Sequence, residues 1–254
     1  MNIINIKGKN FSWQSTYTFS TNKNEIVKLV GDRDGDGQED DIIASGWFIG
    51  QPIGANFDYD WNGIYQEGED MPSWALPGYT KIIDKNGNGE IDVDDRSVLH
   101  SDQPNFRLGI SNTLKWKKFA LNIFINSQKG GYRSNPNLYL QASFYNRANT
   151  LNIPYWTPEN KSNEGPILNF TNPYGHRFYE SRSFVRLQDI SLSYDLPQDL
   201  INKFSIRDIK LYISGKNLYT ITNWSNWDPE IGDQSRGSYG PMYRSWVIGI
   251  NVTL

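Results

Sequence analysis

Apolar and polar residues alternate along several segments of this chain, which is the period-two pattern of β-strands. Between residues 11 and 20, for example, Phe11, Trp13, Tyr17 and Phe19 share one face and polar residues fill the other. Patterns with a helical period are scarce by comparison. The alternation predicts strands at residues 2–7, 11–20, 105–114, 119–128, 183–196, 207–219 and 244–254.

One of these segments changes phase. Within residues 183–196 the alternation slips near Gln188–Asp189, so that apolar residues on the two sides of the slip are out of step. A β-bulge inserts one extra residue and restores the phase. The sequence therefore predicts a bulge at this point.

The connections between the predicted strands fall into two sets that alternate along the chain. Short turns lie at residues 8–10 and 115–118, with a longer turn that starts at Pro197. The other connections are very long and rich in Gly, Asn, Pro and Asp: residues 21–104, 129–182 and 220–243. Short turns at one rim and long external loops at the other are typical of outer-membrane barrels. Because bacterial single-chain barrels have an even number of strands, at least eight, residues 1–254 are predicted to form about seven strands of a larger one.

Composition limits the remaining classes of fold and function. The chain has 254 residues, a formal net charge of −3 and no cysteine, so we expect no nucleic-acid partner, no disulfide and no thiolate metal site. The first ten residues carry no secretory signal, and no segment approaches the roughly 18 apolar residues of a membrane-spanning helix. The remaining alternatives are a soluble cytoplasmic protein and a β-barrel, whose strands escape hydropathy.

Six segments give the chain a family resemblance. It resembles the C-terminal part of SusC/RagA-type TonB-dependent outer-membrane transporters, and the segments follow the order of that family. They are NGIYQEGE (62–69), PGYTKIIDKNGNGEIDVDDR (77–96), YWTPENKSNEGP (155–166), SFVRLQDISLSYDLP (183–197), LYISGKNLYTITNW (211–224) and DPEIG (228–232).

The resemblance implies an all-β fold: a partial transmembrane antiparallel β-barrel with long external loops, located in the outer membrane of a Gram-negative bacterium. The family forms a 22-stranded barrel with an N-terminal plug and a SusD-like surface lipoprotein as its cap. It imports oligosaccharides or peptides with energy from TonB. The partners implied are therefore this lipoprotein, outer-membrane lipid, a glycan or peptide substrate, and TonB through the missing N-terminal part.

Two departures from the family are visible. The plug, the TonB-contacting segment and most of the barrel have no counterpart in these 254 residues, so we expect the chain alone not to transport. Members of the family usually end on Phe, whereas the last residue here is Leu254.

The segment DKNGNGEIDVDD (84–95) is typical of a calcium-binding loop. Calcium takes six to eight oxygen ligands, which a twelve-residue loop supplies at alternating positions around a glycine bend. The expected metal ligands are Asp84, Asn86, Asn88, Glu90, Asp92 and Asp95. The closing residue is Asp rather than the longer Glu, and no helices flank the loop, so we expect a structural site in an external loop and not a sensor. The alternative is a turn held by Asx hydrogen bonds without metal.

A second acidic loop, DRDGDGQEDDII (32–43), repeats this opening. Its weaker candidate ligands are Asp32, Asp34, Asp36 and Asp40. Ile43 stands where the closing carboxylate belongs, although Asp41 could compensate. A solvated acidic loop without metal is the expectation favoured here.

No catalytic motif is present, and we expect no enzyme and no organic cofactor. The two histidines, His100 and His176, form no metal-binding pair, and there is no phosphate-binding loop or nucleophile elbow. Trp224 and Trp227 in a long loop are candidate substrate contacts, since aromatic rings stack on sugars, but loop packing or an interfacial aromatic belt is the explanation favoured here.

Two other classes stay open at this stage. One is a calcium-stabilised extracellular β-sandwich that binds carbohydrate or mediates adhesion, although such a domain would have turns every 8–12 residues. The other is a secreted glycoside hydrolase, which needs two carboxylates about 5–10 Å apart in a cleft.

Overall fold

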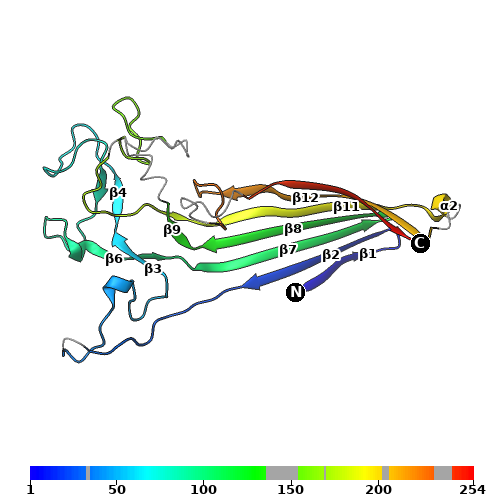
Figure 1. The fold of residues 1–254 in the computed structure, drawn as a ribbon, viewed down its shortest axis with the longest axis horizontal. Coiled ribbons are helices and arrows are strands. Elements are labelled where there is room, and N and C mark those ends of the chain that lie inside the picture. The colour runs from blue at the N-terminus through cyan, green and yellow to red at the C-terminus, as the bar shows by residue number, and fades with distance from the viewer. Residues whose placement is uncertain (33–34, 136–153, 169, 202–205, 232–241) are drawn as a thin grey trace.

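Seven long strands form one antiparallel sheet in the spatial order β1-β2-β7-β8-β11-β12-β13 (Figure 1). The computed structural model describes residues 1–254 except 33–34, 136–153, 169, 202–205 and 232–241. The strands of the sheet are β1 (Asn2–Lys7), β2 (Phe11–Ser20), β7 (Pro104–Trp116), β8 (Phe119–Gly130), β11 (Phe184–Asp195), β12 (Asp208–Thr222) and β13 (Ser245–Thr253). All seven strands predicted from the alternation are confirmed, and β12 continues three residues further than predicted.

The two ends of the sheet differ as the connection lengths predict. At one end the strands join through short turns and a segment that contains the helix α2 (Gln198–Ile201). At the other end the long connections carry short elements: η1 (Ile43–Ser45), β3 (Ala55–Tyr59), β4 (Trp61–Ile64), β5 (Thr80–Ile82), η2 (Val93–Asp95), β6 (Arg96–Ser101), β9 (Tyr132–Ser134) and β10 (Tyr179–Ser181). The sequence did not predict these short strands, which pair as β3 with β6, β4 with β5 and β9 with β10. They lie together beyond the end of the large sheet opposite α2 (Figure 1).

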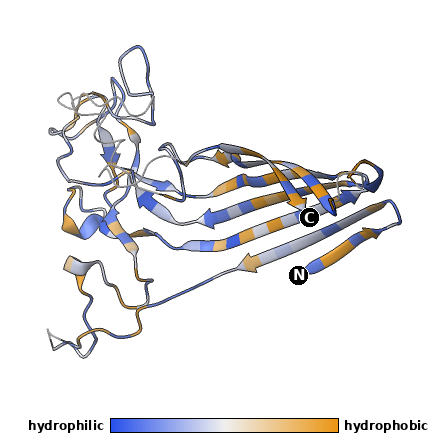
Figure 2. Ribbon diagram, turned by 45° about the vertical axis from the view of Figure 1, so that its right-hand side comes forward, coloured by the Kyte–Doolittle hydropathy of each residue, from blue (hydrophilic) through white to orange (hydrophobic). Residues whose placement is uncertain are grey.

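The strand register places residues that pair across neighbouring strands in rows, some apolar and some largely polar. One row across six strands is entirely apolar: Trp13, Leu114, Leu121, Leu192, Ile213 and Ile248. The next row, one residue along each strand and so on the opposite face, is polar except at its end: Gln14, Thr113, Asn122, Ser191, Ser214 and Val247. Figure 2 shows the same alternation as orange and blue bands along the strands. The sheet therefore has one apolar and one polar face.

The bulge predicted near Gln188 is present. The register of β11 shifts between Leu187 and Asp189 against both of its neighbours, β8 and β12. Leu187 and Ile190 lie three residues apart, yet both pair with isoleucines of β8, Ile125 and Ile123. The extra residue thus keeps both side chains of β11 on the apolar face.

Aromatic side chains mark both ends of the apolar face. At the short-turn end Phe119 lies between Trp116 and Tyr194, with ring centroids 6.1 and 4.6 Å away. The ammonium of Lys117 lies 5.4 Å from the centre of the Trp116 ring. At the long-loop end Phe19 packs against Phe106 at 5.7 Å.

The buried apolar residues lie mainly outside the large sheet. Phe170 and Phe178 form a cluster with Trp61, Tyr79 and Ile167, all from the long connections. By contrast, side chains of the apolar sheet face stay open, among them Ile248 at 80% and Ile213 at 41% exposure. Among the described residues, then, the loops have a core of their own and the apolar face has no cover. No helix in the described part of the chain is long and apolar enough to cross a membrane.

Candidate functional site

A buried arginine on the polar face anchors the connection that follows β12. Arg186 of β11 is fully buried, and its guanidinium forms ion pairs with Asp228, at 2.6 Å, and with Glu230. Its Nε donates to the hydroxyl of Thr220 on β12 at 2.9 Å. The guanidinium also lies 4.9 Å from the centre of the Phe184 ring. Every side of this charge is therefore in contact with a polar or aromatic group, as a buried cation requires.

A second arginine holds the same segment by its backbone. Arg182 donates from Nε to the carbonyl of Pro229 and from a terminal nitrogen to the carbonyl of Glu230, both at 2.6 Å. Burial lowers the pKa of Arg182 below its ordinary value. We call Arg182, Arg186, Asp228 and Glu230 the arginine clamp. It fixes residues 228–230 at the loop end of β11.

A third contact ties the long connection between β8 and β11 to this segment. The amide of the fully buried Asn135, which follows β9, donates to Glu180 at 2.8 Å and to Ser225 at 2.9 Å. The hydroxyl of Ser225 donates to the same carboxylate at 2.9 Å. The connections after β8 and after β12 are thus joined at their bases.

The two tryptophans proposed as substrate contacts differ in exposure. Trp224 is buried, with 4% of its surface exposed, so its ring packs inside the loop and offers no open face. Trp227 is 54% exposed, and its role as a contact stays a prediction. Sequence reasoning did not select Arg186 as a site residue, because a single arginine in a strand gives no signal of its own. The segment DPEIG was noted only as part of the family resemblance.

The predicted calcium loop is closed by hydrogen bonds from its backbone. The two oxygens of Asp84 accept from the N–H groups of Gly87 and Gly89, at 2.6 and 2.8 Å. The Asn86 and Asn88 side chains accept from the N–H groups two residues on, at 2.9 and 2.8 Å. Gly87 and Gly89 have positive φ angles of 74° and 86°, which this sharp bend requires.

The carboxylate of Asp95 closes the loop. Asp95 is 1% exposed and accepts from the backbone of Lys85, Asn86 and Asp92. The N–H group of Asp92 is the main reason that the pKa of Asp95 is lowered, and the side chain of Asp84 lies within hydrogen-bonding reach. The carboxyl groups of Asp84 and Asp95 are thus held close together where the loop closes. This arrangement fits a cation.

The acidic loop at residues 32–43 repeats the first half of this geometry. Asp32 accepts from Gly35 at 2.6 Å and from Gly37 at 2.8 Å, the same pattern as Asp84 with its two glycines. Asp36 accepts from Gln38, while Asp40 lies nearby in the chain and Asp34 falls outside the described residues. Asp41, the suggested substitute for the closing carboxylate, accepts from Ile49 instead.

The donor sets differ between the two loops. No group of three or more His, Asp or Glu side chains in the described parts of the chain is arranged to hold a metal ion. A site in either loop would therefore need asparagine or backbone oxygens as well, such as Asn86, Asn88 and Glu90 in the loop at 84–95. Of the two loops, only the one at 84–95 also has a buried carboxylate, Asp95, in its second half. Calcium binding stays a prediction there, and a weaker one at Asp32, Asp34, Asp36 and Asp40.

The titratable groups of the loop core show no catalytic arrangement among the described residues. Asp58 accepts from Tyr59, Arg177 and the Tyr179 hydroxyl, and burial raises the pKa of its carboxyl. His100 stacks on Tyr132 at 3.9 Å. His176 is 2% exposed beside Phe178, and burial lowers its pKa from 6.5 to about 4.

Known proteins similar to this chain are receptors and importers. No family model matches it. TonB-dependent receptor P3 of Formosa agariphila is 31% identical over 281 aligned residues, which cover 99% of this chain. TonB-dependent receptor SusC of Bacteroides thetaiotaomicron is 24% identical over 96% of the chain. The solved structure of the RagAB peptide importer in its open-open state matches the whole chain with a TM-score of 0.71 and 22% identity.

These matches cover only part of each relative. The chain spans about 28% of the length of receptor P3 and of the RagAB chain, and 24% of SusC. Its seven-stranded sheet matches part of the RagA barrel. The relatives are transporters and not enzymes, in agreement with the expectation that this chain is not an enzyme.

We expect Arg186→Met to destabilise the fold by about 3–5 kcal/mol, because it leaves Asp228 buried without its cation. The matched control is Lys210→Met, which breaks the exposed pair of Lys210 with Asp195 and should cost about 0–1 kcal/mol. Denaturant unfolding in detergent micelles measures both. Equal losses for the two variants would contradict the clamp.

Calcium should bind the loop at 84–95 with a Kd of about 10⁻⁴–10⁻³ M, as in extracellular modules. Asp95→Asn should weaken binding about tenfold or more, since it removes the closing charge, whereas Asp94→Asn, an exposed neighbour, should change it little. Isothermal titration calorimetry measures both. The absence of binding heat at millimolar calcium would leave the loop as a metal-free turn.

The loop core around His176 should weaken on mild acidification. Between pH 6.5 and about 4 the unfolded segment takes up a proton that the folded one refuses, so stability is lost as pH falls, by about 3 kcal/mol in total. No change is expected above pH 7. Hydrogen exchange of residues 170–178 at pH 7.5 and 4.5 measures this effect, and His176→Phe should abolish it. An NMR titration of His176 near pH 6.5 would refute the prediction.

Proposed function

We propose, from the homology of this chain to part of the SusC/RagA-type TonB-dependent receptors, that it forms part of the barrel wall of an outer-membrane importer. The observation that carries the proposal is the two-faced sheet with its row of six apolar side chains from Trp13 to Ile248. In this assignment the apolar face meets lipid and the polar face lines the lumen. TonB-dependent receptors sit in the outer membrane, and we place this chain in that membrane of a Gram-negative bacterium.

The strand lengths support a membrane-spanning wall. β7, β8 and β11 have 13, 12 and 12 residues. A strand of this length extends roughly 40 Å, and at a tilt of about 40° it covers roughly 30 Å along the membrane normal. This exceeds the apolar band of about 25 Å that such barrels present. The aromatic groups at both ends of the apolar face then lie at the two interfaces.

The substrate in this proposal is an oligosaccharide or a peptide, and the partner is a SusD-like surface lipoprotein. The likeness to the RagAB peptide importer and to SusC supports this class. TonB would act through a part of the receptor outside this chain. The arginine clamp would then hold an external loop at the mouth of the lumen, and calcium in the loop at 84–95 would stiffen another.

The alternative of a calcium-stabilised β-sandwich has less support. A sandwich packs a second sheet about 10 Å from the first, over its apolar face. Among the described residues the short strands lie beyond the end of the large sheet instead (Figure 1). No described segment covers the apolar row, and Ile248 remains 80% exposed.

A pair of adjacent substitutions tests the membrane assignment. Ile213→Arg places a charge on the proposed lipid face and should lower stability in a bilayer by about 1–3 kcal/mol, while Ser214→Arg places it in the lumen and should cost less than about 1 kcal/mol. Both residues lie on β12 in neighbouring rows. Reversible unfolding of the protein in liposomes measures the difference. If the two variants are equally stable, or if the protein never enters liposomes, the sheet does not form a membrane-spanning wall.

A further inference from the structure

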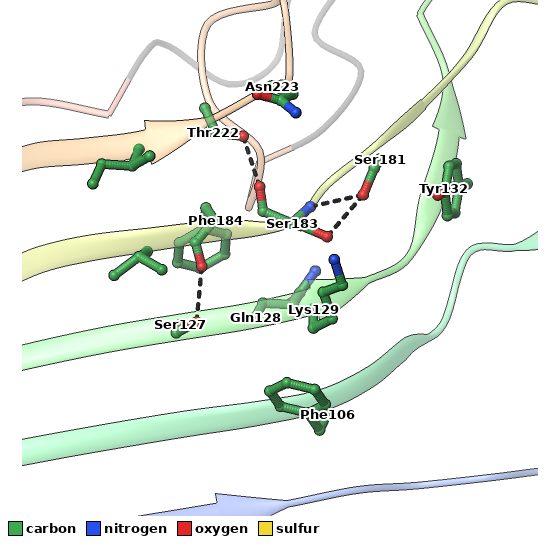
Figure 3. A pocket seen from close by; sticks show the side chains of 12 residues that line it. Phe106, Ser127, Gln128, Lys129, Tyr132, Ser181, Ser183, Phe184, Thr222 and Asn223 are labelled. Atoms are coloured by element: carbon green, nitrogen blue, oxygen red, sulfur yellow. Dashed lines mark hydrogen bonds between the residues drawn. The ribbon is translucent and has the colours of Figure 1, made fainter.

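A hollow of about 460 Å³ lies at the loop end of the apolar face, over β7, β8, β11 and β12 (Figure 3). Three of its lining residues, Ser127, Val185 and Ile221, belong to one register row. The same row continues to Leu108 on β7. The hollow therefore opens on the apolar face of the sheet. Gln128, Phe184 and Thr222, which form the next row and belong to the polar face, line it as well.

The lining of the hollow changes in character along the strands. Toward the middle of the sheet it is apolar, with Val185 and Ile221 at 44% and 61% exposure. Toward the loops it is polar, with Lys129, Ser183 and Asn223. A ligand that fits both parts has an apolar and a polar end.

The polar end has one cation without an anion. Lys129 is exposed, pairs across the strands with Phe106 on the same face, and makes no ion pair with any residue that the structure describes. Its side chain extends toward Ser183 in the hollow (Figure 3). The neighbouring hydroxyls of Ser127 and Thr222 already donate to the carbonyls of Phe184 and Ser183. The charge of Lys129 is thus the main polar feature left for a ligand.

We propose that this hollow binds an anionic, phosphate-bearing lipid, with the phosphate at Lys129 and an acyl chain along Val185 and Ile221. The position supports this occupant, because the hollow lies where the apolar face ends and the loops begin. A lipid headgroup occupies that level in a membrane. An ammonium is a suitable point charge for a phosphate. The inference rests on the proposed function only in assuming that the apolar face meets lipid.

The test compares two lipids that differ only in the phosphate, dioleoyl phosphatidic acid and dioleoyl glycerol. Native mass spectrometry of the protein in mixed micelles measures how much of each stays bound, without any need for bilayer insertion. Phosphatidic acid should bind better than dioleoyl glycerol, and Lys129→Ala should reduce its binding about tenfold, the contribution of one charge-assisted hydrogen bond. The matched control, Lys216→Ala, removes an exposed lysine from the opposite face and should have no effect.

A second variant tests the hollow itself, without changing the charge of Lys129. Val185→Trp fills the hollow and should also release phosphatidic acid, while circular dichroism reports whether each variant is folded. Glycerol phosphate, which has the same phosphate without acyl chains, should compete poorly; equal competition would identify a soluble phosphate as the ligand and overturn the lipid. The inference also fails if both lipids bind equally or if Lys129→Ala binds like Lys216→Ala. Failure of liposome insertion together with these expected results would reject only the proposed function.

Discussion

The hydrogen-bond register of the seven-stranded sheet is the constraint on which the rest of the structure depends. Because side chains alternate with a period of two, a slip of one residue in any strand would move its apolar side chains to the polar face. Six strands keep Trp13, Leu114, Leu121, Leu192, Ile213 and Ile248 in a single row. The bulge at Gln188 has the same effect, since without it Leu187 and Ile190 could not both lie on the apolar face. The register thus produces the apolar wall and the polar wall from one sheet.

A sheet with an uncovered apolar face cannot hold its long connections by packing on a shared core. The connections are held instead by aromatic clusters of their own, such as Phe170 with Phe178, and by buried polar contacts at their bases. The arginine clamp is one of these contacts: Arg186 is fully buried, and both of its anions come from the segment after β12. Asn135, Glu180 and Ser225 join a second connection to the same place. These contacts give the loop end of the sheet a defined shape.

Charge has different roles at the loops and on the sheet. In the loops at 32–43 and 84–95, aspartate oxygens accept from glycine N–H groups and so shape the same turn twice, but only the second loop buries a closing carboxylate, Asp95. On the apolar face, Lys129 lines a hollow and makes no ion pair with any described residue. An unpaired charge at the boundary of an apolar surface is suited to a charged partner from the surroundings, whereas the paired charges of the clamp serve the fold.

The sequence alone determined the strands, their order of connection, the bulge and the family resemblance, because a period-two pattern and the length of a connection are local properties of the chain. The family resemblance also predicted a partial barrel, and the sheet does match part of the RagA barrel. Only the tertiary structure decided which distant residues meet. Arg186 and Asp228 lie 42 residues apart, and nothing in the neighbourhood of either indicates a partner. Trp224 and Trp227 look alike in sequence, yet one is buried and the other exposed, since burial depends on how the loop folds back. The short strands β3 to β6 escaped prediction for the same reason: three to six residues carry too little periodicity, and their pairing is fixed by the packing of the loops.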